Sequence, residues 1–188
     1  IVHHKEMMPQ FEKEKRPIIL LSNISTGIYL FVIGLAKKIL IADSLAIWVN
    51  NFHSTNSTAS FEVAWIISLC YTFQLYFDFS GYMDMATGLA KMININLPQN
   101  FNSPYKSRNI QDFWRRWHIT LGRFLKDYLY TPFGGNKKGT LRLLINVLIV
   151  FVLGGLWHGA GWTFIIWGTL NGIGMAVFIL WRKFGFPL

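Results

Sequence analysis

Cysteine and charge are both scarce in this sequence. Cys70 is the single cysteine among 188 residues, so the chain cannot hold an internal disulfide framework, and no Cys/His spacing indicates zinc. Charged residues make up 14% of the chain, whereas soluble domains usually carry about 25%. A Gly-x-Ser-x-Gly motif is also missing, which leaves a serine nucleophile without support. The chain is therefore unusually apolar for a soluble enzyme, and no metal site is expected.

Apolar and basic residues dominate what is present. Hydrophobic residues make up 52% and aromatic residues 16%, and 18 basic residues against 9 acidic ones give a net charge of +9. The basic residues flank apolar runs, as they do in the cytoplasmic loops of membrane proteins. A nucleic-acid-binding protein would instead carry them as a binding motif or face, so we set nucleic acid aside as a partner.

Several apolar runs are long enough to cross a bilayer, for which a helix needs about 20 residues. They comprise residues 17–36, closed by Lys37 and Lys38, then 61–93, 141–157 and 163–181, with 39–49 as an interfacial helix. We therefore predict an all-α, polytopic membrane protein, a transmembrane helix bundle with amphipathic interfacial helices. Residues 1–188 would form a single membrane-embedded domain, in which 1–16 are a polar loop and 50–60 and 94–108 are connecting loops.

The segment after Asn109 reads as an interfacial helix that continues to about Tyr130. Asn109 is an N-cap residue, and apolar side chains recur at every fourth position while basic ones occupy other faces. Pro132 ends this helix, and a basic glycine-rich turn follows at residues 133–139. Because ten Lys and Arg fall between Lys91 and Arg142, we expect this side to be cytoplasmic.

His158 lies in a glycine-rich stretch, residues 154–162, between two apolar runs. The run before it, 143–153, is interrupted only by Asn146. A helix from Arg142 to His158 would rise about 24 Å, less than the ~30 Å hydrocarbon core, so His158 should lie inside the membrane-embedded protein. A titratable residue at that depth usually marks a site. The alternative is a histidine that is hydrogen-bonded in a core or caps a helix.

Two acids, Asp78 and Asp84, interrupt the second long run. They either face a polar cavity or packing interface within the protein, or lie at the end of a span in headgroup water. His118 is the second histidine of interest. Imidazole is suited to general-base chemistry near neutral pH, and His118 could orient or polarise a donor while His158 takes a proton from an attacking hydroxyl.

Three separate stretches resemble the membrane-bound O-acyltransferase family, and most closely its alginate O-acetyltransferase-like branch. They are residues 113–121 (FWRRWHITL), 128–139 (YLYTPFGGNKKG) and 155–160 (GLWHGA), and residues 76–82 (YFDFSGY) fit the same family. The resemblance implies a bundle of membrane helices around a tunnel. Family members are longer, so we expect this chain to be an internal or C-terminal fragment of an incomplete fold.

By this resemblance His158 and His118 are the catalytic residues, and we assign Trp157, Arg115, Arg116 and Asp78 to substrate binding. Arg115 and Arg116 either attract a phosphate-bearing donor or anchor the cytoplasmic side. Whether His158 acts as a general base or relays the acetyl group stays open.

The resemblance also implies partners and a location. It predicts acetyl transfer from a cytoplasmic donor, with no bound cofactor and acetyl-CoA as the natural donor, toward an exported polysaccharide such as alginate. The expected partners are membrane lipid, the polysaccharide and a periplasmic or extracellular SGNH-type acetyltransferase. The expected location is the bacterial inner or cytoplasmic membrane, crossed several times. The alternatives are D-alanyl transfer to teichoic acid and a non-catalytic, acyl-conducting membrane subunit.

Overall fold

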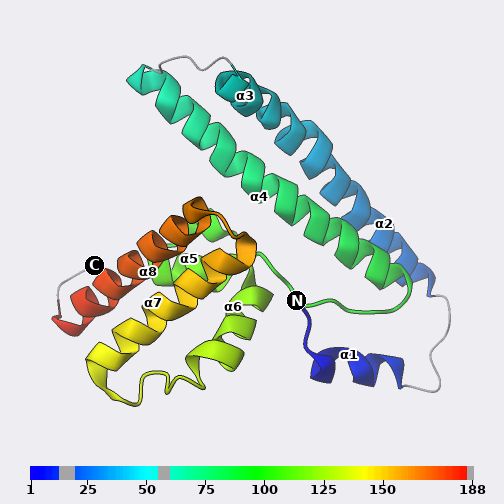
Figure 1. Ribbon diagram of the computed structural model, residues 1–188. Helices are drawn as coiled ribbons and strands as arrows, with labels where there is room; N and C mark the ends of the chain where they lie inside the picture. Colours follow the sequence, from blue (N-terminus) through cyan, green and yellow to red (C-terminus); the bar gives the residue numbers. More distant parts are fainter. Residues whose placement is uncertain (13–19, 55–59, 186–188) are drawn as a thin grey trace. The chain divides into compact units, whose positions relative to one another are not determined.

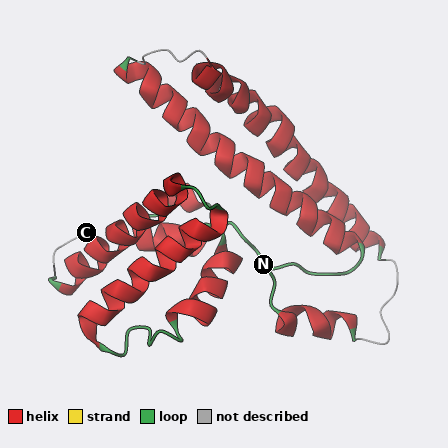
Figure 2. Ribbon diagram, in the orientation of Figure 1, coloured by secondary structure: helices red, strands yellow, loops and turns green. Residues whose placement is uncertain are grey.

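The computed structural model describes residues 1–12, 20–54 and 60–185. Within these ranges the chain forms helices joined by turns and loops and contains no strand (Figure 2). It divides into two compact units, Val2–Pro98 and Gln99–Leu188, with Ile1 joining the second. The predicted all-α class is confirmed, whereas a single membrane-embedded domain stays a prediction.

The first unit contains a pair of long helical segments that lie side by side and one short helix (Figure 1). Its helices are α1 (His4–Phe11), α2 (Leu21–Ala36), the π-helical segment η1 (Lys37–Ala42), α3 (Asp43–Ser54) and α4 (Phe61–Met92). The pair brings α2 and α4 close together because glycines face glycines across the contact. Small residues let helix backbones approach closely, as is common in membrane helix packing.

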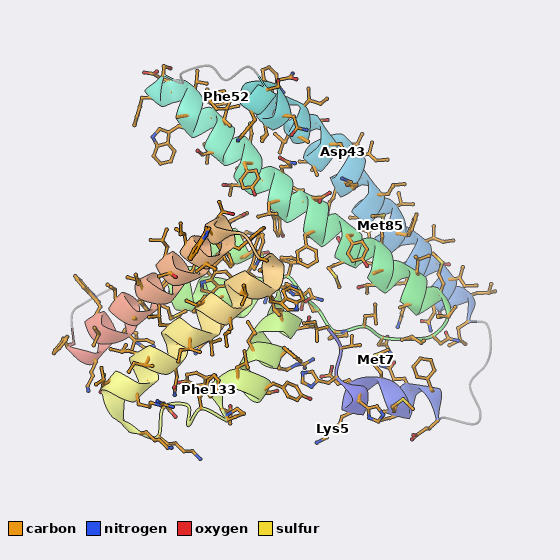
Figure 3. All side chains as sticks on the ribbon, in the orientation of Figure 1. Lys5, Met7, Asp43, Phe52, Met85 and Phe133 are labelled. Atoms are coloured by element: carbon orange, nitrogen blue, oxygen red, sulfur yellow. The ribbon has the colours of Figure 1, made fainter. Side chains whose placement is uncertain are left out.

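Lys37 and Lys38 do not end a helix, contrary to the sequence prediction. Helical backbone runs through both lysines as η1 and continues into α3. Lys37 Nζ lies 2.5 Å from Asp84 Oδ2, and Lys38 Nζ lies 2.6 Å from Asp78 Oδ1. Lys38 also pairs with Asp43, labelled in Figure 3, at 2.7 Å. Each lysine is thus paired with at least one acid, and the two acids of α4 take part in contacts between helices.

The polar loop predicted for residues 1–16 is wrong over His4–Phe11, which forms α1. A reciprocal amide pair stabilises this helix: Gln10 Nε2 donates to Asn96 O at 3.0 Å, and Asn96 N donates to Gln10 Oε1 at 2.9 Å. Such a contact, 86 residues away in sequence, leaves no trace in local composition. Residues 13–16 of that prediction and the start of the first apolar run at Pro17 lie outside the described residues. The loop predicted at 50–60 is wrong over 50–54, which belong to α3 (Asp43–Ser54), and 55–59 of it lie outside the described residues.

The second unit carries the candidate site. Its elements are the 3₁₀ turn η2 (Pro104–Lys106), α5 (Ile110–Arg116), α6 (Ile119–Leu125), the π-helical η3 (Lys126–Tyr130), α7 (Gly139–His158) and α8 (Trp162–Lys183). Asn109 caps α5 as predicted, because its Oδ1 accepts a bond from Asp112 N at 2.8 Å. The last helical segment before the turn ends at Tyr130, two residues before Pro132.

The predicted continuous helix from Asn109 to about Tyr130 is wrong, because the helix breaks at Trp117–His118. His118 has φ 44°, in the left-handed region. The preceding loop takes backbone bonds that a helix would use: Ile119 N donates to Asn100 O at 2.9 Å, and Asn102 N donates to Arg116 O at 3.0 Å. This break separates α5 from α6, with His118 between them.

Helices α7 and α8 are long and apolar enough to cross a membrane. Only 22% and 17% of their most apolar stretches are buried within the chain, whereas the core helix of a soluble protein would be mostly buried. Large apolar side chains are exposed on both, including Leu141 at 73% and Trp162 at 78%. Lys183 Nζ donates to Thr140 Oγ1, so the basic ends of both helices lie together, as predicted from Arg142 and Arg182.

Asn146 ties the basic turn to α7. It is fully buried, and its Nδ2 donates to Phe133 O at 3.2 Å and to Gly135 O at 3.0 Å. Phe133, labelled in Figure 3, and Gly135 belong to the turn that precedes α7. Non-helical backbone near lipid needs partners inside the protein because lipid offers none. Asn146, seen in the sequence only as an interruption, supplies them.

We expect Asn146→Leu to destabilise the full-length protein by about 2 kcal/mol, because it leaves two carbonyls without their donor. Loss of Asn146 Oδ1, which has no partner among the described residues, offsets part of this cost. Thermal unfolding in detergent measures the change. Asn171→Leu is the matched control, since the Asn171 amide donates to Trp167 O of its own helix, at 2.9 Å. Equal stability of the two variants would contradict this role of Asn146.

Candidate functional site

His118 sits at the helix break between α5 and α6 and is buried, with 8% of its surface exposed. Its Nδ1 lies 3.0 Å from Asn100 Oδ1. The same oxygen accepts bonds from Thr120 Oγ1 at 2.7 Å and from Thr120 N at 3.3 Å. Asn100 and Thr120 are themselves buried. The imidazole is therefore held in a compact polar network that joins the loop before α5 to the start of α6.

The surroundings of His118 keep the ring uncharged. Burial lowers the pKa of His118 to about 4, with a smaller contribution from His158. Removing a charged imidazolium from water is unfavourable, so the neutral form predominates at pH 7. A neutral imidazole keeps a lone pair on one nitrogen, which is what an acceptor of protons or hydrogen bonds needs.

His158 is the last residue of α7, and a short turn then leads into α8. Its ring packs edge-on against Trp157 at 5.0 Å and against Trp167 of α8 at 5.6 Å between ring centroids. His158 is exposed on the surface of this chain, so the described residues do not enclose it. The predicted position at a turn is confirmed, whereas enclosure within the embedded protein stays a prediction.

Aromatic rings connect α5 to α7, which carries His158, and to α8. Trp114 of α5 packs edge-on against Phe151 of α7 at 5.2 Å and against Trp167 of α8 at 5.9 Å. Trp167 in turn contacts His158. Because Trp114 lies four residues before His118, this packing holds both predicted catalytic histidines within one unit.

The predicted substrate-binding residues fall into different surroundings. Arg116 Nε donates to Asp112 Oδ2 at 3.0 Å, an ion pair within α5 that lowers the pKa of Asp112. Arg115 is exposed and is the better placed of the two arginines for an anionic ligand. Trp157 is 57% exposed beside His158. Asp78 belongs to the first unit, where it pairs with Lys38. Substrate binding by these residues stays a prediction.

Sequence reasoning missed Asn100, Thr120, Trp114 and Trp167 as parts of the site. Asn100 was assigned to a loop, and no periodicity marks it. The two tryptophans look like ordinary packing residues of apolar helices until their contact with each other is known. Within the described ranges, no cluster of three or more His, Cys, Asp or Glu could hold a metal ion. The arrangement supports chemistry by two imidazoles in an aromatic setting.

Comparison with known proteins places these features in a wider group. Residues 1–185 match the sequence profile of the membrane-bound O-acyltransferase family. A peptidoglycan O-acetyltransferase from Helicobacter pylori is 55% identical over 192 residues, which cover 100% of this chain and 36% of that protein. A probable alginate O-acetylase AlgI from Azotobacter vinelandii is 44% identical over 177 residues, covering 94% and 35%.

A more distant relative is named for a different activity. A teichoic acid D-alanyltransferase from Bacillus subtilis is 31% identical over 169 residues, which cover 84% of this chain and 42% of that protein. The chain spans little more than a third of the length of the first two relatives. The match thus extends along almost all of this sequence but along a minor part of each relative.

Proposed function

Because this chain belongs to the membrane-bound O-acyltransferase family, we propose that the protein is an O-acyltransferase that moves acetyl groups from a cytoplasmic donor toward an exported polysaccharide. The family predicted from the motifs is confirmed, and with it the membrane character of the protein. The observation that carries the acetyl assignment is the 55% identity, over the whole chain, to a peptidoglycan O-acetyltransferase. Probable alginate O-acetylases at more than 40% identity support a glycan as acceptor.

In the proposed reaction, an acceptor hydroxyl attacks the carbonyl carbon of an acetyl thioester, for which acetyl-CoA is the donor. The new C–O bond forms as the C–S bond breaks. His158 takes the proton of the hydroxyl as general base and returns it to the departing thiolate. His118 assists as a neutral imidazole, and Trp157 and Arg115 contact the substrates. The exposed ring of His158 and its aromatic neighbours support this assignment, since a base must be reachable by its substrate.

We place the protein in the bacterial inner or cytoplasmic membrane, which it crosses several times. The two apolar helices α7 and α8 support this placement. An acetyl group that reaches the outer face still has to reach the polymer, so a periplasmic or extracellular SGNH-type acetyltransferase is the proposed partner.

Inside-out membrane vesicles that contain the full-length protein test the proposal. Labelled acetyl-CoA is supplied at the cytoplasmic face, and alkali-labile label is measured in glycan fragments enclosed with a soluble acetyltransferase partner. We expect label to appear in the glycan, and not in vesicles from cells that lack the protein. Absence of acetyl transfer with every glycan offered would contradict the proposal.

A second candidate function follows from the Bacillus subtilis relative. Its name and its 31% identity favour D-alanyl transfer to teichoic acid as the alternative. The same vesicles, supplied with labelled D-alanine on its carrier protein, separate the two donors. Transfer of D-alanine but not of acetyl would select this alternative, whereas a non-catalytic conducting subunit would transfer neither acyl group when purified.

A further inference from the structure

One side-chain oxygen, Asn100 Oδ1, lies within hydrogen-bond distance of three atoms from two residues of the helix break. His118 Nδ1 lies at 3.0 Å, Thr120 Oγ1 at 2.7 Å and Thr120 N at 3.3 Å. The exposed fraction is 5% for Asn100, 8% for His118 and 1% for Thr120. This network is thus buried within the second unit, and it includes His118, one of the two residues that the motifs indicate as catalytic.

The contact with the Thr120 backbone identifies the atoms of this network. A backbone N–H can only donate, so the Asn100 atom that faces it must be the carboxamide oxygen and not the nitrogen. A carboxamide oxygen can only accept, so His118 Nδ1 must carry a hydrogen. A neutral imidazole has one N–H, and its lone pair therefore lies on Nε2.

We propose that Asn100 is a positioning residue that fixes His118 in the Nδ1–H form and so presents Nε2 as the proton or hydrogen-bond acceptor in acyl transfer. The proposal rests on the proposed function, in which His118 assists the reaction. Thr120 holds the Asn100 carboxamide in place through its hydroxyl and backbone N–H. Enzymes commonly orient a catalytic histidine by a partner on its other nitrogen.

The neutral character of Asn100 suits this role. Burial already favours the uncharged form of the His118 ring. A carboxylate at position 100 would instead favour the imidazolium, by roughly one to three pH units for a buried contact of this kind. An amide orients the ring without charging it.

Asn100→Asp in the full-length protein is the sharpest test. The carboxylate still accepts the Nδ1–H bond, but it stabilises the protonated ring. We expect the acid limb of the pH profile of acyl transfer to move upward by at least about one pH unit, with activity recovering at higher pH. Asn102→Asp is the matched control: this side chain is exposed, and Asn102 bonds to Arg116 through its backbone N–H and carbonyl oxygen. An unmoved profile in Asn100→Asp, or equal shifts in both variants, would overturn the proposal.

Asn100→Ala and a pair of Thr120 variants extend the test. Asn100→Ala should lower kcat by at least about tenfold, with KM changed less than twofold, because ring orientation rather than substrate binding is lost. Thr120→Ser, which keeps the hydroxyl, should retain activity, and Thr120→Val should lose part of it. If Asn100→Ala does not fold, the comparison of Thr120→Ser with Thr120→Val still tests the proposal. Equal activity of these two variants would contradict the role of the network.

A spectroscopic measurement separates this proposal from the proposed function. The ¹⁵N signals of the His118 ring in labelled full-length protein, assigned by their absence in His118→Ala, report which nitrogen is protonated. We expect hydrogen on Nδ1 in the wild type and loss of that preference in Asn100→Ala. Hydrogen on Nε2 in the wild type would overturn the positioning role, whatever the enzyme transfers. Full activity of His118→Ala would instead contradict the part of His118 in the proposed function.

Discussion

His158→Ala should reduce acetyl transfer by the full-length protein at least about 100-fold, the range found for loss of a general base. The ring is exposed at the end of α7 and packs only edge-on against Trp157 and Trp167. Its removal therefore costs little packing, and we expect protein level and thermal stability to stay close to those of the wild type. The vesicle assay with labelled acetyl-CoA measures the activity.

His53→Ala is the matched control for this experiment. His53 is also an exposed histidine near a helix end, where its Nδ1 lies 2.8 Å from Val49 O, and it lies in the other unit. We expect this variant to keep full activity. Wild-type transfer by His158→Ala would remove the general-base role, and a covalent acetyl adduct on His158 in the absence of acceptor would show that it relays the group instead.

The sequence predicted the long apolar helices well because each is encoded by its own composition. The run at 61–93 became α4 (Phe61–Met92), and the runs on either side of the glycine-rich stretch became α7 and α8. The same physical rule explains these successes: a segment rich in apolar side chains satisfies its backbone as a helix when neighbours or lipid surround it. The glycines after His158 predicted that a helix ends near this residue.

The features that sequence could not predict depend on long-range contacts. Apolar side chains continue at every fourth position across Trp117–His118, so periodicity indicated one helix. The break arises because Asn100, 18 residues earlier, bonds to the His118 ring and to Ile119 N. Likewise Lys37 and Lys38 look like the end of a span until acids of α3 and α4 pair with them.

The close contact between α2 and α4 leads to the largest expected effect on stability. A Cβ added at Gly34 would lie 2.5 Å from Gly81 O, and one added at Gly81 would lie 2.7 Å from Gly34 O. Gly27 and Gly88 form a second reciprocal pair, with distances of 2.6 and 2.5 Å to the partner's carbonyl oxygen. These carbonyl oxygens are backbone atoms, which cannot rotate away as a flexible side chain can. Any larger residue must therefore push the helices apart.

Gly34→Val should consequently lower the stability of the full-length protein by about 3 kcal/mol or more, at the upper end of overpacking effects, and reduce the amount of monodisperse protein recovered in detergent. Separation of the helices would also weaken the ion pairs that Lys37 and Lys38 make with α4, which adds to the loss. Gly122→Ala is the control: the nearest atom to its added Cβ is Trp114 O at 3.8 Å, and alanine favours helix by about 0.5–1 kcal/mol over glycine. Wild-type recovery and melting of Gly34→Val would mean that α2 and α4 do not pack through their glycines in the membrane.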